Sequence, residues 1–275
     1  MSGLYWLASY PKSGNTWVRC FLAALSAGGE MPDFAKLTKT ARASAARAWI
    51  EEVLDVPTSD LTQDELVLAR RAMHEIQTQT PELSRYLKVH DRYDPVLFAP
   101  EITAGIVLIV RDPRDVAPSY AEHMGVSLDY AIELMGRPGR KVADGEDYNL
   151  HASQIFSSWS DHAASWLEQS ASQVLLLHYE DLTDRPVENF GRLAAFLGLK
   201  PDSDTLRLAV EATRFDVLRA REDTLGFGER PVQMNRFFRQ GRAGAWSGVL
   251  TESQADRIVG DHRAMMIRLG YLPEG

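Results

Sequence analysis

The sequence predicts an α/β fold of three layers, in which helices flank a central parallel sheet. Apolar runs of strand length, at residues 4–8, 105–110 and 173–179, alternate with longer segments of helix-forming composition. The run 105–110 is apolar along its whole length, which is typical of a central parallel strand buried on both faces. Ligands of such sheets bind where the strands end, so we expect the functional residues at these positions.

Composition and charge limit the classes of protein to which the chain can belong. Its 275 residues are 45% hydrophobic and 25% charged, as expected for an ordinary soluble domain. We therefore expect one domain over residues 1–275, with a helical insertion at about 33–80. The net charge of −8 argues against a nucleic-acid partner, because such proteins present a basic surface to the phosphates.

The cysteine content and the hydropathy pattern indicate a cytoplasmic protein. Cys20 is the only cysteine, which excludes an internal disulfide framework, and no Cys and His residues have the spacing of a zinc site. We therefore expect no bound metal. No apolar stretch approaches the roughly 20 residues of a membrane span. The N-terminal apolar run also lacks the basic flank of an export signal, so no membrane partner is expected.

Helices are predicted after the first strand and in the insertion. Residues 16–25 follow the strand 4–8 and have helix-forming composition. Residues 36–71 are rich in Ala, Arg, Glu and Leu, and Pro57 opens a cap-like Thr-Ser-Asp break that divides them into two helices. We expect this insertion to lie near a substrate cleft.

The middle of the chain continues the alternation of strands and helices. Proline is favoured in the first turn of a helix, and a glycine-rich segment of mixed charge is typical of an exposed, flexible loop. The predicted elements are a short strand at 86–90, the strand at 105–110, a helix from Pro113 to Met124 and a loop at 136–148.

The C-terminal half is predicted mainly from helical spacing and capping sequences. Apolar residues at helical spacing predict a helix over 152–170, in which Trp159 and Trp166 pack in the core. A Thr-Glu-Ser-Gln sequence from Thr251 can cap a final helix that runs to about residue 269. The other elements are a strand at 173–179, helices at 184–197 and 203–212, and a loop at 224–245.

The segment Tyr-Pro-Lys-Ser-Gly-Asn-Thr-Trp at residues 10–17 is the most informative motif. It joins the first strand to a helix, and a small-residue loop in that position forms a phosphate cradle. The N–H groups and the dipole at the helix N-terminus attract an anion, and Lys12 adds a mobile positive charge. The motif is not a Walker A loop, because its lysine precedes its only glycine. We predict a P-loop-like site that differs from an ordinary ATP or GTP loop.

Two further strands end in residues that suit an anion site. Lys88 and His90 are two apart on a short strand, so both side chains point to one side. Arg111 follows the central strand and can make a two-pronged contact with a phosphate, and Ser119 lies two turns into the next helix. Simpler interpretations remain: a surface lysine beside a structural histidine, and a self-paired charge cluster at 111–115.

Together these segments resemble the sulfotransferases that use 3′-phosphoadenosine 5′-phosphosulfate (PAPS). The octet at 10–17 is similar to their 5′-phosphosulfate loop, and the wider run 6–20 looks especially like bacterial enzymes that sulfate natural products. Arg111 with Ser119 resembles the 3′-phosphate motif, and residues 238–246 resemble the C-terminal R-x-G-x-x-G-x-W segment. A bland flexible loop is the alternative for that last segment.

The resemblance implies transfer of a sulfuryl group from PAPS to a hydroxyl of a small-molecule acceptor, with release of 3′-phosphoadenosine 5′-phosphate (PAP). The implied catalytic residues are His90 as the base, with Lys12 and Lys88 stabilising charge. Gln240 departs from the family, which often has lysine there. The residues implied to bind the nucleotide are Lys12, Ser13, Gly14, Asn15, Thr16, Trp17, Arg111, Ser119, Tyr179, Thr213, Phe215, Arg239, Gln240 and Gly241.

Some of these assignments are weaker, and some questions stay open. Trp17, Tyr179 and Phe215, with Thr213, are assigned to the adenine by the family pattern alone, since aromatic residues at such spacing often belong to the core. The remaining histidines are expected on the surface or in helices: His74, His123, His151, His162, His178 and His262. The acceptor is unidentified, although nearby aromatic residues suggest an apolar or aromatic one, and an amine is a less favoured alternative to a hydroxyl.

Two other functions and the oligomeric state also stay open. A P-loop-type kinase of a small metabolite is the main alternative, although the loop lacks the lysine position of Walker A. A catalytically silent nucleotide-binding protein is the other alternative, and the presence of both Lys12 and His90 argues against it. A homodimer is open as well, because the short dimer motif of some animal relatives is mostly absent: Ser247 and Glu252 replace two of its residues.

Overall fold

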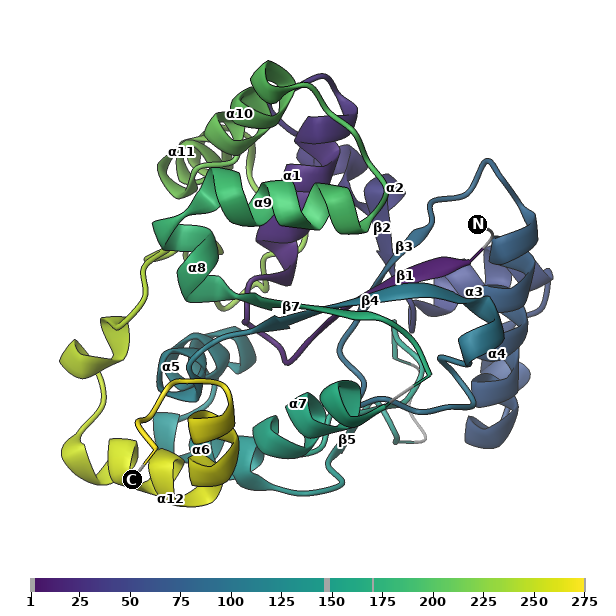
Figure 1. Cartoon of the computed structure of the whole chain (residues 1–275). Helices are drawn as coiled ribbons and strands as arrows, with labels where there is room; N and C mark the ends of the chain where they lie inside the picture. Colours follow the sequence, from purple (N-terminus) through teal and green to yellow (C-terminus); the bar gives the residue numbers. More distant parts are fainter. Residues whose placement is uncertain (1–2, 146–148, 170, 275) are drawn as a thin grey trace.

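The computed structural model describes residues 3–145, 149–169 and 171–274. Its centre is a five-stranded parallel sheet in the order β2-β3-β1-β4-β7 (Figure 1). The predicted α/β fold with a central parallel sheet is therefore confirmed. The strands are β1 (Leu4–Ser9), β2 (Ala41–Ala43), β3 (Tyr86–Val89), β4 (Thr103–Val110) and β7 (Val174–His178).

The order of the strands places β1 between β3 and β4: after β1 the chain forms β2 and β3 on one side of it and then crosses to form β4 and β7 on the other side. Such a switch point opens a crevice at the carboxyl ends of the strands. The register aligns Ala8 with Val89 and with Leu108, so the residues that follow β1, β3 and β4 come together at one edge.

Helices cover both faces of the sheet and complete the three layers (Figure 1). Two groups of helices form these layers. Leu7, Val107 and Leu177 pack against the first group on one face of the sheet. Trp6, Ile106 and Leu108 pack against the second group on the other face. The first group is α1 (Asn15–Ser26), α9 (Pro186–Phe196) and α10 (Ser203–Ala212), and the second is α5 (Pro113–Met124), α6 (Leu128–Gly136), α7 (Trp159–Glu168) and α12 (Glu252–Arg268).

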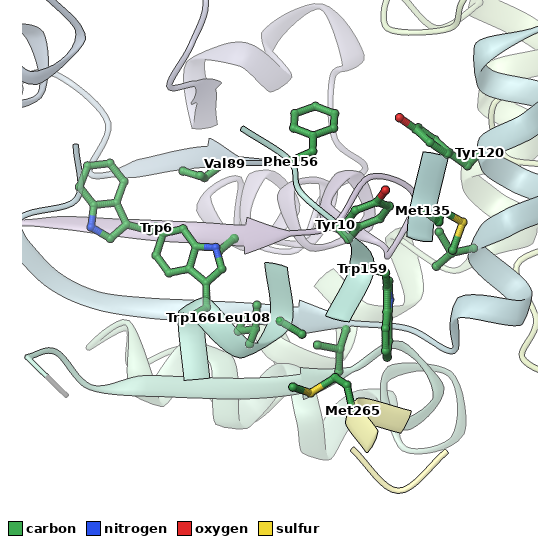
Figure 2. Packing of buried hydrophobic residues seen from close by; sticks show 14 of the residues in the cluster. Trp6, Tyr10, Val89, Leu108, Tyr120, Met135, Phe156, Trp159, Trp166 and Met265 are labelled. Carbon is green, nitrogen blue, oxygen red and sulfur yellow. The ribbon is translucent and has the colours of Figure 1, made fainter. Parts of the chain in front are cut away.

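The core on the second face is rich in large aromatic side chains (Figure 2). Trp6 and Trp166 are completely buried, and each satisfies its indole N–H: Trp6 donates to the Thr103 hydroxyl at 2.8 Å, and Trp166 donates to the Asp91 carbonyl at 3.0 Å. Trp159 is also buried in this cluster. The prediction that Trp159 and Trp166 pack in the core is confirmed.

The insertion contains a strand that its composition concealed. β2 lies inside the segment 36–71, which was predicted to be purely helical, and it forms the edge of the sheet beside β3. Its three residues, Ala-Arg-Ala, favour a helix by propensity, but pairing with β3 overrides that preference. The helices of this region are α2 (Leu37–Thr40), α3 (Arg47–Leu54) and α4 (Gln63–Gln79).

The helix predicted over 152–170 is shorter in the structure, and the prediction of its first third is wrong. β6 (Gln154–Ile155) pairs antiparallel with β5 (Lys141–Val142) instead. Ser157 has a φ of 59°, and the Ser158 side chain then caps α7 by accepting the Asp161 N–H. The helical spacing of Ile155 and Phe156 was therefore coincidental. Residues 146–148 of the predicted flexible loop lie outside the described residues.

The other predicted helices and strands lie close to their expected bounds, whereas α6 and α8 (Tyr179–Asp184) were not predicted and β5 lies inside the predicted loop 136–148. The loop assigned from residue 224 is preceded by the helix α11 (Phe215–Leu225), which was also not predicted, and the following segment 226–244 is irregular. No helix among the described residues combines the length and the apolar character that a membrane span requires. The remaining elements are the 3₁₀ turns Phe34–Lys36, Thr58–Asp60, Pro100–Ile102 and Ala245–Gly248.

Candidate active site

A cavity of about 1080 Å³ opens at the carboxyl ends of β1, β3 and β4. Among the residues predicted to bind the nucleotide or to act in catalysis, only Ser13 and Thr213 do not line it. The predicted residues that do line it are Lys12, Gly14, Asn15, Thr16, Trp17, Lys88, His90, Arg111, Ser119, Tyr179, Phe215, Arg239, Gln240 and Gly241.

The loop after β1 turns sharply into α1 through two backbone conformations of positive φ. Lys12 has a φ of 70° and Gly14 a φ of 108°. A side chain at Gly14 would also place its Cβ 2.8 Å from the Tyr179 ring, so only glycine fits there. The Asn15 amide fastens the start of α1 to β1 by donating to the Leu7 carbonyl at 2.8 Å. The N-terminus of α1 is thereby fixed beside the cavity.

Ser13 lies at the centre of this turn but is completely buried. Its N–H donates to the Tyr10 carbonyl at 3.3 Å, which closes the loop. Its hydroxyl has no hydrogen-bond partner among the described residues, although buried polar atoms are normally paired. Ser13 therefore shapes the loop from a buried position between Lys12 and Gly14, which both line the cavity.

Lys12 carries its ammonium into a crowded, positively charged part of the cavity. The Nζ atom lies 4.2 Å from the centre of the Phe237 ring. Burial, together with the charges of Lys88 and Arg111, lowers the pKa of Lys12 to about 8. This ammonium is therefore less stable in the free protein than an ordinary lysine, and an anion beside it would stabilise its charge.

His90 follows β3 and is held by the end of β1. Its Nδ1 lies 2.7 Å from the Ser9 carbonyl oxygen and 3.3 Å from the Ser9 hydroxyl. A carbonyl can only accept, so Nδ1 carries the proton and Nε2 keeps a free lone pair. Burial and the Lys88 charge also hold the pKa of His90 well below its usual value. His90 is therefore a neutral imidazole with one nitrogen ready to accept a proton.

Lys88 lies beside His90 on the same side of β3, as its spacing predicted. Its Nζ lies 3.9 Å from the nearer carboxylate oxygen of Glu229. Burial lowers the pKa of Lys88 to about 8, and Glu229 opposes this shift. The two predicted catalytic lysines and the predicted base thus share one cavity. The sequence of each strand by itself could not reveal this proximity.

Arg111 joins the phosphate loop to the C-terminal segment. Its guanidinium donates to the Lys12 carbonyl at 3.4 Å and to the Arg242 carbonyl at 3.2 Å, and it stacks 4.2 Å above the Tyr179 ring. Its Nε has no hydrogen-bond partner among the described residues. Ser119 lines the same cavity from α5. The basic groups of residues 12 and 111 therefore converge, as the predicted nucleotide site requires.

The other charges of the 111–115 cluster are structural, as expected. Arg114 pairs with Asp112 at 2.6 Å. The Asp115 carboxylate accepts the N–H groups of Gly244 and Trp246 at 2.7 and 2.8 Å, which fastens the C-terminal segment to α5. Arg111 lines the cavity and forms no ion pair with the acidic residues of this cluster among the described residues, so the interpretation as a purely self-paired surface cluster is wrong for that residue.

The segment 239–241 closes one wall of the cavity, though not in every detail as predicted. Gly241 has a φ of 63°, and a Cβ there would lie 2.0 Å from the Phe215 ring, so the backbone packs directly on that ring. The Arg239 Nε lies 3.1 Å from a carboxylate oxygen of Glu122 on α5. The predicted phosphate ligand thus already has a carboxylate partner, which sequence reasoning did not anticipate.

Three aromatic side chains assigned to the adenine do form one wall. Trp17, Tyr179 and Phe215 line the cavity, and the Trp17 and Tyr179 rings meet edge to face at 5.6 Å between centroids. Thr213 has a different position from the predicted one. It is completely buried, and its hydroxyl donates to the Ala209 carbonyl at 2.7 Å. Its carbonyl accepts the Trp17 indole N–H at 2.8 Å, so Thr213 orients that ring.

Several residues of the cavity had no signal in the sequence. His123 and His151 line it, which corrects the expectation that they are only surface or helix residues. Glu229 lies in the irregular segment 226–244, where no motif marked it. No group of three or more His, Cys, Asp or Glu in the described ranges could hold a metal ion.

Most of the chain matches one protein family. The sulfotransferase domain model matches residues 4–269. Sulfotransferase 1B1 of Mus musculus is 26% identical over 265 residues, which cover 92% of this chain and 79% of the relative. Sulfotransferase 2A1 of Rattus norvegicus is 25% identical over 257 residues, which cover 91% of this chain and 80% of the relative. These relatives are mammalian, so the narrower similarity to bacterial enzymes is not supported.

Solved structures show the same fold. Retinol dehydratase in complex with androsterone and PAP aligns with a TM-score of 0.63 at 19% identity, over 95% of this chain and 80% of that one. Mouse sulfotransferase SULT7A1 with PAP aligns with a TM-score of 0.61 at 19% identity, over 98% and 86%. The chain belongs to the sulfotransferase domain family, and the protein is a sulfotransferase that takes its sulfuryl group from PAPS.

Proposed function

We propose that His90, Lys12 and Lys88 perform the transfer of the sulfuryl group from PAPS to a hydroxyl of an apolar or aromatic small molecule. The observation that supports this most directly is the shared cavity, in which a neutral imidazole with a free Nε2 lies beside two ammonium groups. A base and two cations in one partly buried site suit a reaction in which an oxygen loses a proton while negative charge develops nearby.

The residues around the phosphate loop fit the nucleotide. The buried Ser13 hydroxyl and the Arg111 Nε are both unpaired among the described residues, and Arg111 lines the cavity. Gly241 lines the cavity, and the absence of a side chain lets its backbone pack directly on the Phe215 ring. We assign the 5′ end of the nucleotide to the loop 12–17 and the 3′-phosphate to Arg111, Ser119 and the segment 239–241.

Each catalytic residue has a distinct role in this proposal. PAPS supplies the sulfuryl group. His90 Nε2 accepts the proton of the acceptor hydroxyl, and its Nδ1–H stays bonded to the Ser9 carbonyl, so the ring keeps its orientation as it becomes charged. Lys12 and Lys88 stabilise the negative charge on the oxygens at the reacting centre. Arg111 takes no part in the reaction itself, because it only binds the nucleotide and fixes its position.

The acceptor side of the cavity supports an apolar or aromatic partner. Trp49, Leu150 and Phe156 line it, and Phe156 meets the His90 ring at 6.0 Å between centroids. The structures of retinol dehydratase contain androsterone in one case and retinol in another. We propose an acceptor of that apolar kind, with a hydroxyl favoured over an amine.

The same proposal includes the wider setting of the enzyme. We place the whole activity in one domain over residues 1–275, with the insertion at about 33–80 contributing Trp49 to the acceptor side. A cytoplasmic location, the absence of a nucleic-acid partner and a homodimer as an open option stay predictions from the sequence.

Calorimetry and turnover together test the proposal. PAP should bind far more tightly than ATP or AMP, and turnover of labelled PAPS should appear in a panel of phenols and apolar alcohols that includes 2-naphthol. Tighter binding of ATP and turnover that requires Mg²⁺ would favour the kinase alternative. Tight PAP binding with no transfer to any member of the panel would favour a silent binding protein.

A further inference from the structure

Glu229 occupies a position that joins three parts of the site. It belongs to the irregular segment 226–244. Its carboxylate accepts two hydrogen bonds from the Arg19 guanidinium, at 2.9 and 2.7 Å, and its Oε2 lies 3.9 Å from the Lys88 ammonium. One carboxylate thus contacts a helix behind the phosphate loop and a catalytic lysine on β3.

Arg19 gives Glu229 a fixed place. The Arg19 side chain on α1 is only 1% exposed, and its Nε donates to the Ala41 carbonyl at 3.0 Å, at the start of β2. Because the guanidinium is planar and bidentate, it fixes both oxygens of the carboxylate. Glu229 is therefore anchored by α1 and presents one oxygen toward Lys88.

We propose that Glu229 is a positioning residue for sulfuryl transfer: it holds the Lys88 ammonium in place and keeps it charged in the cavity. This inference rests on the proposed catalytic role of Lys88. The irregular segment 226–244 contains both Glu229 and residues 239–241, which are assigned to the 3′-phosphate. The position of the 3′-phosphate site and the position of the Lys88 ammonium therefore depend on the same stretch of chain.

The charges around Lys88 show why it needs this partner. Cations and imidazoles approach it from every neighbouring element: Arg19 from α1, Lys12 from the phosphate loop, His90 from the end of β3, His123 from α5, and His151. Glu229 is the acidic group that faces it among the described residues. Burial already lowers the pKa of Lys88 to about 8, so loss of the carboxylate would lower it further.

The test measures the charge of Lys88 directly by NMR on protein labelled with ¹³C,¹⁵N-lysine, with the Lys88 signal assigned from Lys88→Arg. In Glu229→Gln the midpoint of the Lys88 titration should fall by about one pH unit, because an opposite charge at this distance shifts a pKa by roughly that amount or more. An unchanged midpoint in the folded variant would overturn the proposal.

Glu222→Gln is the matched control, because Glu222 anchors the same segment without facing Lys88. Its buried carboxylate accepts the N–H groups of Phe237 and Phe238 at 2.7 and 2.9 Å. This variant should bind PAP more weakly yet leave the Lys88 titration in place. If it lowered the midpoint as much as Glu229→Gln does, the effect would come from loosening of the segment, and the proposal would fail.

Turnover of labelled PAPS with 2-naphthol gives an independent readout. The alkaline limb of kcat in Glu229→Gln should move to lower pH, with about a tenfold loss of rate one pH unit above the new midpoint. Adding Lys88→Arg to Glu229→Gln should restore the limb, because a guanidinium stays charged throughout this range. A limb that remained at its wild-type position in Glu229→Gln would contradict the proposal.

Stability and PAP binding distinguish a failure of the role proposed for Glu229 from a failure of the proposed function. If Glu229→Gln does not fold because Arg19 is left buried without a partner, the double variant Arg19→Gln, Glu229→Gln removes both charges. Its Lys88 midpoint should still fall, since Glu229 affects Lys88 more than Arg19 does. Absence of PAP binding in the wild-type protein would instead reject the proposed function itself, whatever the NMR titration showed.

Discussion

The imidazole of His90 donates its Nδ1–H to the carbonyl oxygen of Ser9 across a distance of 2.7 Å. The two residues are neighbours because Ala8 and Val89 pair in register immediately before them, where β1 and β3 end. The parallel pairing of two strands thus selects the tautomer of the imidazole and directs Nε2 away from the sheet. The chemistry of the proposed base follows from this hydrogen bond.

Replacement of this imidazole should separate catalysis from binding. His90→Ala should lower kcat by about 10² to 10⁴, the usual contribution of a positioned general base. Its affinity for PAP should stay close to that of the wild type, because the His90 ring is bonded to Ser9, which is not assigned to the nucleotide. Turnover assays with labelled PAPS and calorimetry with PAP measure the two effects. A fully active His90→Ala variant would show that another group is the base.

Removal of the Arg111 guanidinium should mainly weaken the binding of PAP, in contrast to the loss of kcat expected for His90→Ala. Arg111→Ala should weaken PAP binding by about 10- to 100-fold, since hydrogen bonds to a charged group contribute roughly 1.5–3 kcal/mol. Arg114→Ala is the matched control, because Arg114 pairs with Asp112 and stacks 4.4 Å from the Trp246 ring. Calorimetry should show a much smaller loss of PAP affinity in that variant. Equal losses in both would argue against a 3′-phosphate site at Arg111.

Gly241 tests the close approach of the backbone to the Phe215 ring. Gly241→Ala adds a Cβ that would lie 2.0 Å from that ring, in addition to the strain of a positive φ, so PAP affinity should fall. Gly244→Ala has a similar φ of 71° but no heavy atom within 4 Å of the added Cβ. The control therefore isolates the clash from the backbone strain. PAP titrations that gave the same affinity for both variants would exclude a role for this contact.

The pH dependence of turnover should be asymmetric. The pKa of His90 lies well below its usual value, so the base stays neutral and the acid limb should appear only well below pH 6.5. The pKa values of Lys12 and Lys88 are both about 8, and their positive charge is lost as the pH rises through that value. The profile of kcat/KM should therefore decline above about pH 8.

The bound nucleotide should alter only the alkaline side of this profile. Negative charge beside Lys12 favours its ammonium form, so the alkaline limb of kcat, which reports the complex, should lie at higher pH than that of kcat/KM. Rate measurements from pH 5 to 10 with saturating and limiting PAPS distinguish the two. Coincident alkaline limbs would contradict contact between Lys12 and the nucleotide.

The ion pair behind His90 should be important for stability. Arg70 and Asp91 are both almost completely buried and lie 2.9 Å apart, and Asp91 directly follows His90. Asp91→Asn leaves the Arg70 charge without its carboxylate, which should lower the free energy of unfolding by about 3–5 kcal/mol. Urea unfolding measures this loss. As a control, Glu168→Gln removes an exposed pair with Arg268 and should cost less than about 1 kcal/mol.

Much of the fold could be predicted because its signals are local. The apolar runs that form β1, β4 and β7 and the capping sequence of α12 each specify their element within a few residues. The three residues of β2 could not be identified in this way, because only pairing with β3 makes them a strand. The late start of α7 was missed because Ile155 and Phe156 happen to match helical spacing.

The residues of the site divide in the same way: those in short motifs could be predicted, and those that only folding brings close could not. The spacing of Lys88 and His90 and the loop 10–17 showed which residues face the edge of the sheet. Their electrostatic partners could not be foreseen. Glu229 reaches Lys88, and Glu122 reaches Arg239, from segments more than a hundred residues away in the chain. No periodicity or motif links such residues.

The amino-acid sequence by itself determined the strands β1, β4 and β7, the phosphate loop and the side of β3 on which Lys88 and His90 lie, because backbone geometry and short-range spacing fix these features. Only the tertiary structure decided that Thr213 orients Trp17 through its carbonyl, and that Arg19 and Lys88 share one carboxylate. Those contacts depend on the path of the chain between distant elements, and the packing of the whole fold selects that path.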